Sequence, residues 1–143
     1  MNLETIFSVC NSFALAGWIV LIFLPFWKKR DQYVLGIIIL LLAAAYSWII
    51  FWTMNRDTID NFSTLAGVAR LFADDTVLLA GWIHYLAFDL LAGIYVVRNA
   101  VKNGINHWLT TPALFFAFLL GPFGLLLYVV LRWAKTRKFL TDF

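Results

Sequence analysis

Two ionisable side chains, His84 and Asp89, interrupt an otherwise apolar run from Thr76 to Val97. Ionisable groups inside such runs are costly to place in lipid and usually face a cavity or a partner. Asp89 lies 13 residues into the run, about 20 Å from the start of a helix and near the middle of a membrane. A carboxyl group buried there can hold or exchange a proton, as a general acid or base acting on an apolar substrate does. The alternative is a structural carboxylate bonded to Tyr85 one turn earlier, or to another helix.

His84 is the second candidate for acid/base chemistry. Five residues separate it from Asp89, so the two side chains point about 140° apart on a helix and could flank a substrate from two sides of one groove. The Tyr85 phenol lies between them and could donate a proton to a substrate oxygen. The alternatives are a core histidine bonded to a neighbouring helix and a tyrosine that only packs.

Positions at 100° per residue divide this run into two faces. One face combines polar, aromatic and small residues: Gly81, Trp82, His84, Tyr85, Phe88, Asp89, Ala92 and Tyr95. The opposite face is aliphatic: Leu79, Ile83, Leu86, Leu90, Ile94 and Val97. We expect the aliphatic face to contact lipid and the polar face to point inward. On that polar face, Trp82, Phe88 and Ala92 are expected to contact substrate. Asn11, in the first apolar run, is expected to bond across helices and to contribute to the same substrate site.

Several kinds of chemistry are excluded by what the sequence lacks. Cys10 is the single cysteine and His84 and His107 the two histidines, too few for a cysteine-based metal centre or a His-rich di-iron site. Neither dinucleotide nor nucleotide phosphate-binding motifs occur, so we expect no cofactor and no metal. The net charge of +3 comes from basic residues at the ends of apolar runs, which is typical of membrane proteins rather than of nucleic-acid binding.

The composition predicts the elements that must position these residues. Of 143 residues, 63% are hydrophobic and 13% charged, with a mean hydropathy of +0.84, far from a soluble domain. We therefore expect an all-α integral membrane protein with one domain, residues 1–143. A spanning helix needs about 20 apolar residues, and four apolar runs predict a four-helix bundle with spans at about 6–27, 33–54, 76–97 and 112–131.

The polar segment between the second and third spans predicts a short amphipathic helix on the membrane surface. Phe62, Leu65, Ala69 and Phe72 recur at helical spacing. Asp60 or Asn61 could serve as its N-cap, and Asp74 or Asp75 should cap the third span. A connector packed on the surface and a lid over a site are the two interpretations.

Gly121-Pro122 should kink or break the fourth run near its middle. Four full spans place five Lys/Arg on one side and six on the other, which leaves sidedness open. The usual dominance of the first helix favours an outside N-terminus. A fourth run that turns back at Gly121 would instead place nine Lys/Arg on one side of the membrane and two on the other. Each half, however, has only about ten residues, which is too short to cross.

Three segments together resemble a known family. They are the run from Ala80 to Leu90 (AGWIHYLAFDL), Gly104 to His107 (GINH) and Gly121 to Tyr128 (GPFGLLLY). They resemble the ABA4-like family, whose plant member is required for neoxanthin formation in plastids. The resemblance covers residues 62–132 clearly and the first two spans diffusely. It implies a four-helix membrane protein connected to xanthophyll metabolism.

The reaction that the resemblance implies converts an epoxide into an allenic alcohol. It is redox-neutral, which agrees with the missing cofactor motifs. The chain starts almost directly at its first span, without a plastid presequence, so we expect a bacterial inner membrane. The first hypothesis is an isomerase of a carotenoid or related isoprenoid that uses Asp89, His84 and Tyr85. The alternatives are a non-catalytic carotenoid- or lipid-binding or assembly protein, possible as a homodimer, and a proton-coupled transporter.

Overall fold

Three long apolar helices dominate the computed structural model, which describes residues 2–54 and 56–137, without the side chains of Arg56 and Asp57. Helix α1 is Leu3–Phe23. The second is continuous from Arg30 to Thr53 and comprises α2 (Arg30–Tyr33), the wider π-helical turn η1 (Val34–Ile39) and α3 (Leu40–Thr53). The third, α6, is Asp75–Lys102. All three are long and apolar enough to cross a membrane, three such helices rather than the four predicted, and the predicted all-α class is confirmed for the described residues. Every regular element in the described part of the chain is helical.

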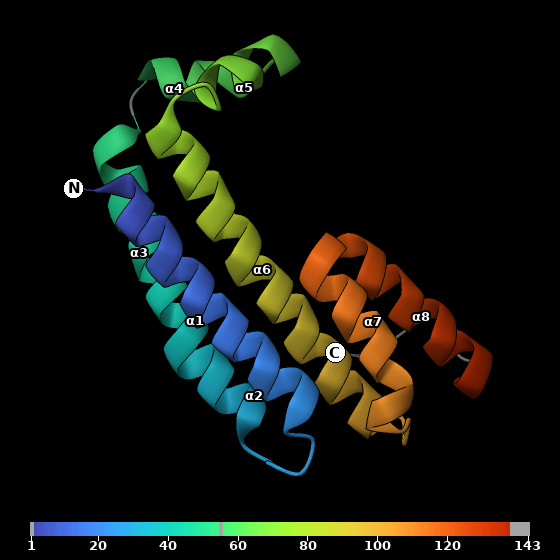
Figure 1. The fold of residues 1–143 in the computed structure, drawn as a ribbon. Helices are drawn as coiled ribbons and strands as arrows, with labels where there is room; N and C mark the ends of the chain where they lie inside the picture. Colours follow the sequence, from blue (N-terminus) through green and yellow to red (C-terminus); the bar gives the residue numbers. More distant parts are fainter. Residues whose placement is uncertain (1, 55, 138–143) are drawn as a thin grey trace.

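Helix α6 is the central element, because α1, α3, α7 and α8 all pack against it (Figure 1). The side chains of its aliphatic face are buried, with Ile83 and Leu90 fully inaccessible. The expectation that this face contacts lipid is therefore wrong. Lipid tails are as apolar as leucine, so hydrophobicity cannot distinguish the lipid-facing side of a helix from the protein-facing side. The opposite face, which includes Trp82, His84 and Phe88, is largely exposed, and Asp89 is its buried exception.

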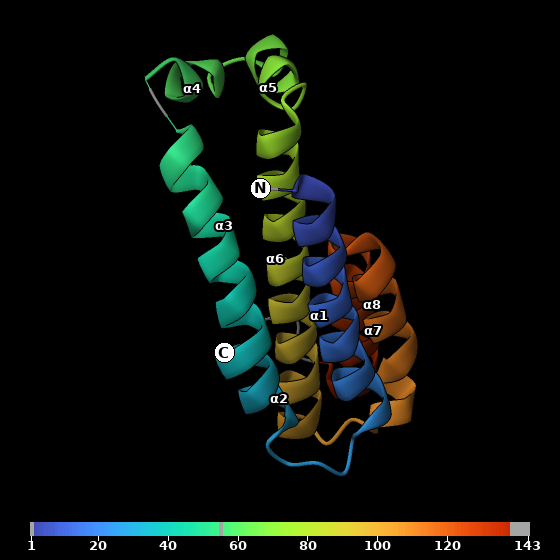
Figure 2. The same cartoon turned by 60° about the vertical axis from the view of Figure 1, so that its left-hand side comes forward.

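Two short helices, rather than the single one expected, connect the second and third long helices. They are α4 (Arg56–Asn61) and α5 (Leu65–Leu71), and they lie across the ends of α3 and α6 (Figure 2). Thr64 caps α5 by accepting from the Gly67 amide at 3.0 Å. The expected N-cap at Asp60 or Asn61 is wrong because these residues end α4. Asp74 does cap α6 as expected, accepting from the amides of Thr76 and Val77.

The fourth apolar run forms a hairpin instead of one span. Helix α7 (His107–Leu120) and helix α8 (Pro122–Thr136) pack antiparallel, with Gly121 between them at φ +42° (Figure 1). The predicted break is confirmed, but the predicted continuous span 112–131 is wrong. Gly124 lies so close to Ala117 and Ala113 that an added Cβ would overlap backbone atoms of both. Small residues on both arms therefore let the chain double back.

Candidate functional site

The tip of the α7–α8 hairpin rests on two side chains of α6, Tyr85 and Asp89. The Tyr85 hydroxyl donates to the Leu119 carbonyl at 3.2 Å, and the Asp89 carboxylate lies beside that hydroxyl, one turn later on α6. Gly121 lies against that carboxylate, since a Cβ there would be 2.9 Å from Asp89 Cγ. Asp89 is only 8% exposed, and its Oδ2 has no hydrogen-bond partner among the described residues. A buried polar atom of this kind is rare in native proteins, and a catalytic role is one of the explanations for it.

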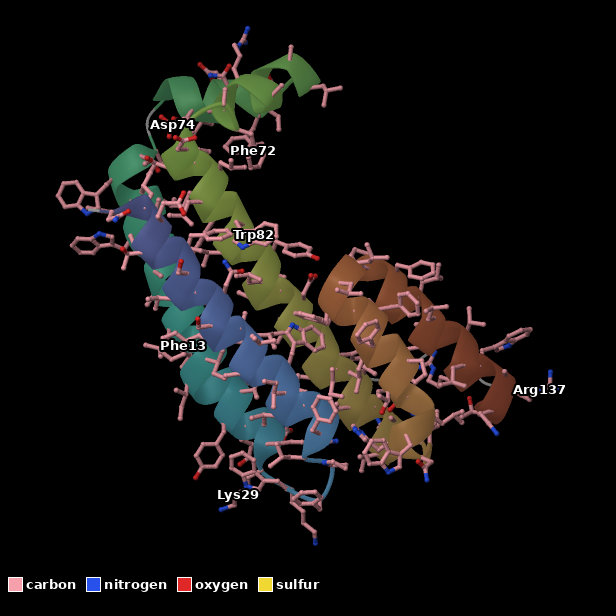
Figure 3. The ribbon with its side chains drawn as sticks, in the orientation of Figure 1. Phe13, Lys29, Phe72, Asp74, Trp82 and Arg137 are labelled. Carbon is pink, nitrogen blue, oxygen red and sulfur yellow. The ribbon has the colours of Figure 1, made fainter. Side chains whose placement is uncertain are left out.

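Trp82 extends this cluster toward α1. Its indole Nε1 donates to Asn11 Oδ1 at 3.0 Å, which confirms that Asn11 bonds across helices. The Trp82 ring also contacts Tyr85 and Phe7, at centroid distances of 5.4 and 5.9 Å. Trp82 projects from α6 on the side that faces the hairpin tip (Figure 3). Asn11, Trp82, Tyr85 and Asp89 thus form a continuous chain of contacts from α1 to the hairpin tip.

His84 lies on a different side of α6. Its ring stacks on Phe88 at 4.5 Å and contacts Tyr46 of α3 at 5.5 Å. The structure therefore places His84 and Phe88 toward α3, whereas Asp89 and Tyr85 face the hairpin. Ala92, the remaining predicted substrate contact, is half-buried on α6. The predicted site residues of α6 are therefore divided between two faces: Trp82, Tyr85 and Asp89 lie on the face where Trp82 bonds Asn11 of α1, and His84 and Phe88 lie on the other.

Two grooves adjoin α1 on either side of this cluster. The upper groove, about 470 Å³, lies between the N-terminal parts of α1 and α6, and Trp82 and Phe7 form part of its lining. The lower groove, about 500 Å³, lies between α1 and α7. Its lining is apolar and rich in aromatic rings, including Trp18, Phe115 and Phe118. Phe7, Asn11, Leu15, Trp18 and Ile22 succeed one another at three- or four-residue intervals, so they follow one stripe of α1.

A second polar cluster, which the sequence reasoning missed, closes the opposite end of α1. The Arg30 guanidinium is 4% exposed and donates to the Leu21 carbonyl at 3.1 Å. It also contacts His107 Nδ1 at 3.3 Å, while His107 Nε2 bonds the Ile22 carbonyl at 2.8 Å. A carbonyl can only accept, so the proton lies on Nε2 and Nδ1 accepts from Arg30. Arg30 and His107 therefore cap the C-terminus of α1. The sequence signal that could have indicated this cap was Arg30, a cation just beyond the first apolar run.

Among the side chains that the structure describes, no three His, Cys, Asp or Glu residues gather as a group that could hold a metal ion.

With the geometry described, comparison with known proteins identifies the family. The ABA4-like family, described as ABA DEFICIENT 4-like, matches residues 5–128. The chain belongs to the ABA4-like family. Protein ABA DEFICIENT 4, chloroplastic, of Arabidopsis thaliana is 29% identical over 68 residues, which are 48% of this chain and 30% of the plant protein. The match therefore spans less than a third of that relative. No solved structure matches the chain.

The family assignment confirms the resemblance, and the three long apolar helices are compatible with a membrane protein. The curated relative is chloroplastic, so it lends no support to the expected bacterial inner membrane, which stays a prediction.

Proposed function

We propose that this protein is a redox-neutral intramembrane isomerase of a carotenoid, xanthophyll or related isoprenoid. The observation that carries the proposal is the buried Oδ2 of Asp89, without a hydrogen-bond partner in the described structure and in the middle of α6. Tyr85, which lies beside the same carboxylate, supplies the second proton-carrying group. The ABA4-like family assignment supports the substrate class.

The proposed reaction converts an epoxide beside a conjugated chain into an alcohol with a new carbon–carbon double bond. The Tyr85 hydroxyl gives its proton to the epoxide oxygen as the carbon–oxygen bond breaks. Asp89 Oδ2 accepts the proton from the adjacent chain carbon, and the electron pair of that carbon–hydrogen bond forms the double bond. The proton then passes from Asp89 to the neighbouring Tyr85 oxygen, which restores both groups to their starting state. Atoms and electrons balance without a cofactor.

The grooves beside α1 suit a long apolar ligand of this class. Aromatic rings in the lower groove offer stacking surfaces to a conjugated chain. A ligand that lies along the α1 stripe meets Asn11, Trp82 and Tyr85 at the polar cluster. His84, on the α3 side, is left outside the proton-transfer pair in this proposal.

We place α1, the Arg30–Thr53 helix and α6 across the membrane. The α7–α8 hairpin then enters the membrane from its basic end, the side on which the Lys28–Arg30 loop lies. Helix α7 is about 21 Å long at 1.5 Å per residue, less than the roughly 30 Å of a hydrocarbon core. The hairpin therefore reaches the middle of the bilayer, which is the depth of Asp89 on α6.

The test is a pigment profile of cells that produce an epoxide xanthophyll, with and without this gene. We expect one compound to decrease and another of identical mass to appear. Asp89→Asn, which keeps the size of the side chain, should abolish the new compound, and Tyr85→Phe should reduce it by at least tenfold. His84→Gln serves as the matched control on the same helix and should retain activity. Full product formation by Asp89→Asn would exclude the assigned role.

A non-catalytic carotenoid- or lipid-binding protein is the second candidate. It is favoured by the close fit of Asp89 against Gly121, which also suits a structural carboxylate that docks the hairpin. In that case the pigment profiles are identical, and pigment or lipid co-purifies with the wild-type protein. Phe115→Ala and Phe118→Ala, in the lower groove, should then lower the amount retained.

A further inference from the structure

A third groove runs along the C-terminal half of α6, on a side that the proposed site does not use. It measures about 390 Å³, and its lining follows one stripe of the helix. The stripe begins with apolar residues and ends with polar and basic ones: Leu91, Ile94, Tyr95, Arg98, Asn99 and Lys102. From Leu91 to Lys102 the helix rises about 17 Å, close to half of a hydrocarbon core. The groove thus changes from apolar to basic over the depth of one leaflet.

All the residues that line this groove belong to α6, and neighbouring helices contact some of them from two sides. Helix α6 lies between the α2–α3 helix and the hairpin (Figure 2). On one side, Arg98 pairs through its Nε with Asp31 of α2. On the other side, the Tyr128 hydroxyl of α8 donates to Asn99 Oδ1 at 2.7 Å, and the Tyr128 ring contacts Tyr95.

The charged residues that line the groove are all positive. Its lining includes two cations, Arg98 and Lys102, and no carboxylate. Asp31 neutralises part of one of them, and its side chain is 14% exposed against 54% for Arg98. A groove with an apolar floor and two cations at the membrane surface complements an amphiphile with an anionic head.

We propose that this groove binds an anionic glycerophospholipid. The acyl chain lies along Leu91, Ile94 and Tyr95, and the phosphate contacts Arg98 and Lys102. The site is separate from the Asp89 cluster and does not depend on the isomerase proposal.

The test measures lipid binding to the purified, delipidated full chain in detergent by native mass spectrometry. Phosphatidylglycerol and phosphatidylcholine with identical acyl chains are the probes. We expect phosphatidylglycerol to bind at least fivefold more tightly. Because one basic residue near a membrane surface contributes roughly a fivefold preference for an anionic lipid, Lys102→Ala should remove about that factor. The affinity of the Lys102→Ala variant for phosphatidylcholine should stay the same.

Two further variants serve as controls for Lys102→Ala. Lys135→Ala is the matched control, because Lys135 is an exposed lysine in the last turn of α8 and does not line the groove. It should bind like the wild type, and Lys102→Arg should retain the preference. Equal affinities for the two lipids would overturn the proposal, as would an equal loss in Lys135→Ala. Tighter binding of farnesyl phosphate than of phosphatidylglycerol would also overturn it, since the occupant would then be an isoprenoid phosphate.

Discussion

The carboxylate of Asp89 lies against the Cα of Gly121, at the point where the chain reverses between α7 and α8. The contact leaves no room for a side chain at position 121. The backbone there has φ +42°, a conformation that favours glycine. The residue that could do chemistry and the residue that permits the hairpin are therefore in direct contact.

Gly121→Ala should destabilise the protein by about 3 kcal/mol, because the new methyl group overlaps Asp89 and the backbone is strained for a residue with Cβ. Thermal unfolding in detergent measures the loss. Gly36→Ala is the matched control, since an added Cβ at Gly36 meets no atom within 4 Å, and its stability should be unchanged or slightly higher. Shortening the opposing side chain in Gly121→Ala/Asp89→Ala should recover part of the loss. Equal stability of Gly121→Ala and wild type would contradict the close contact.

Trp82→Phe should lower the free energy of unfolding by about 0.6 to 1.7 kcal/mol, because it removes the bond to Asn11 while it keeps an aromatic ring beside Phe7 and Tyr85. Asn11→Leu should cost a similar amount. In the double variant the two losses should not add, since both remove one bond. Trp48→Phe, at an exposed tryptophan of α3, is the control. Additive losses at Asn11 and Trp82 would show that the two side chains do not interact.

The stability of the protein should decrease as the pH falls from 7.5 to 5.5, in part through His107. Burial, reinforced by the Arg30 charge, lowers the pKa of His107 from its ordinary value of 6.5, although its bond to Ile22 opposes this. The His107 side chain therefore binds a proton in the unfolded chain at a pH where it does not in the folded chain. The free energy of unfolding decreases as the pH falls through 6.5. His107→Gln, which can still donate to Ile22, should show a smaller decrease in Tm. Parallel Tm curves for the two proteins would exclude this role for His107.

A reporter fused after Arg137 should lie on the same side of the membrane as the Lys28–Arg30 loop, and one inserted at Ser63 on the opposite side. The hairpin returns α8 toward the C-terminal end of α6, where that loop also lies (Figure 1). The basic C-terminal end of α8 and the Lys28–Arg30 loop then lie on the same side of the membrane. The positive-inside rule assigns that side to the cytoplasmic face or its equivalent. Opposite-side signals from Arg137 and the loop would instead indicate a full fourth span.

The long helices could be predicted from the sequence because apolar length determines a membrane span. The start of α6 was predictable in the same way, since a capping aspartate, Asp74, has a local signature. The Arg30–His107 bond escaped prediction because the two residues lie 77 positions apart, and local patterns carry no information on such a pairing.

The orientation of α6 and the reversal at Gly121 were not predictable for a related reason. Glycine followed by proline indicates where a helix ends but not the direction in which the next one leaves. That direction is determined by packing, here by the small residues Ala113, Ala117 and Gly124 on the two arms. Their spacing was the signal that could have indicated a tight hairpin.

A hairpin that stops halfway gives the two leaflets unequal shares of protein. In the membrane placement proposed above, the three long helices cross the leaflet on the α4–α5 side, and the two arms of the hairpin join them in the other leaflet. The cross-section of the molecule therefore widens toward its basic end, which makes it a wedge. A wedge of this kind fits a curved bilayer better than a flat one, because lipids on the narrow side must fill the space beside Trp82 and Phe88.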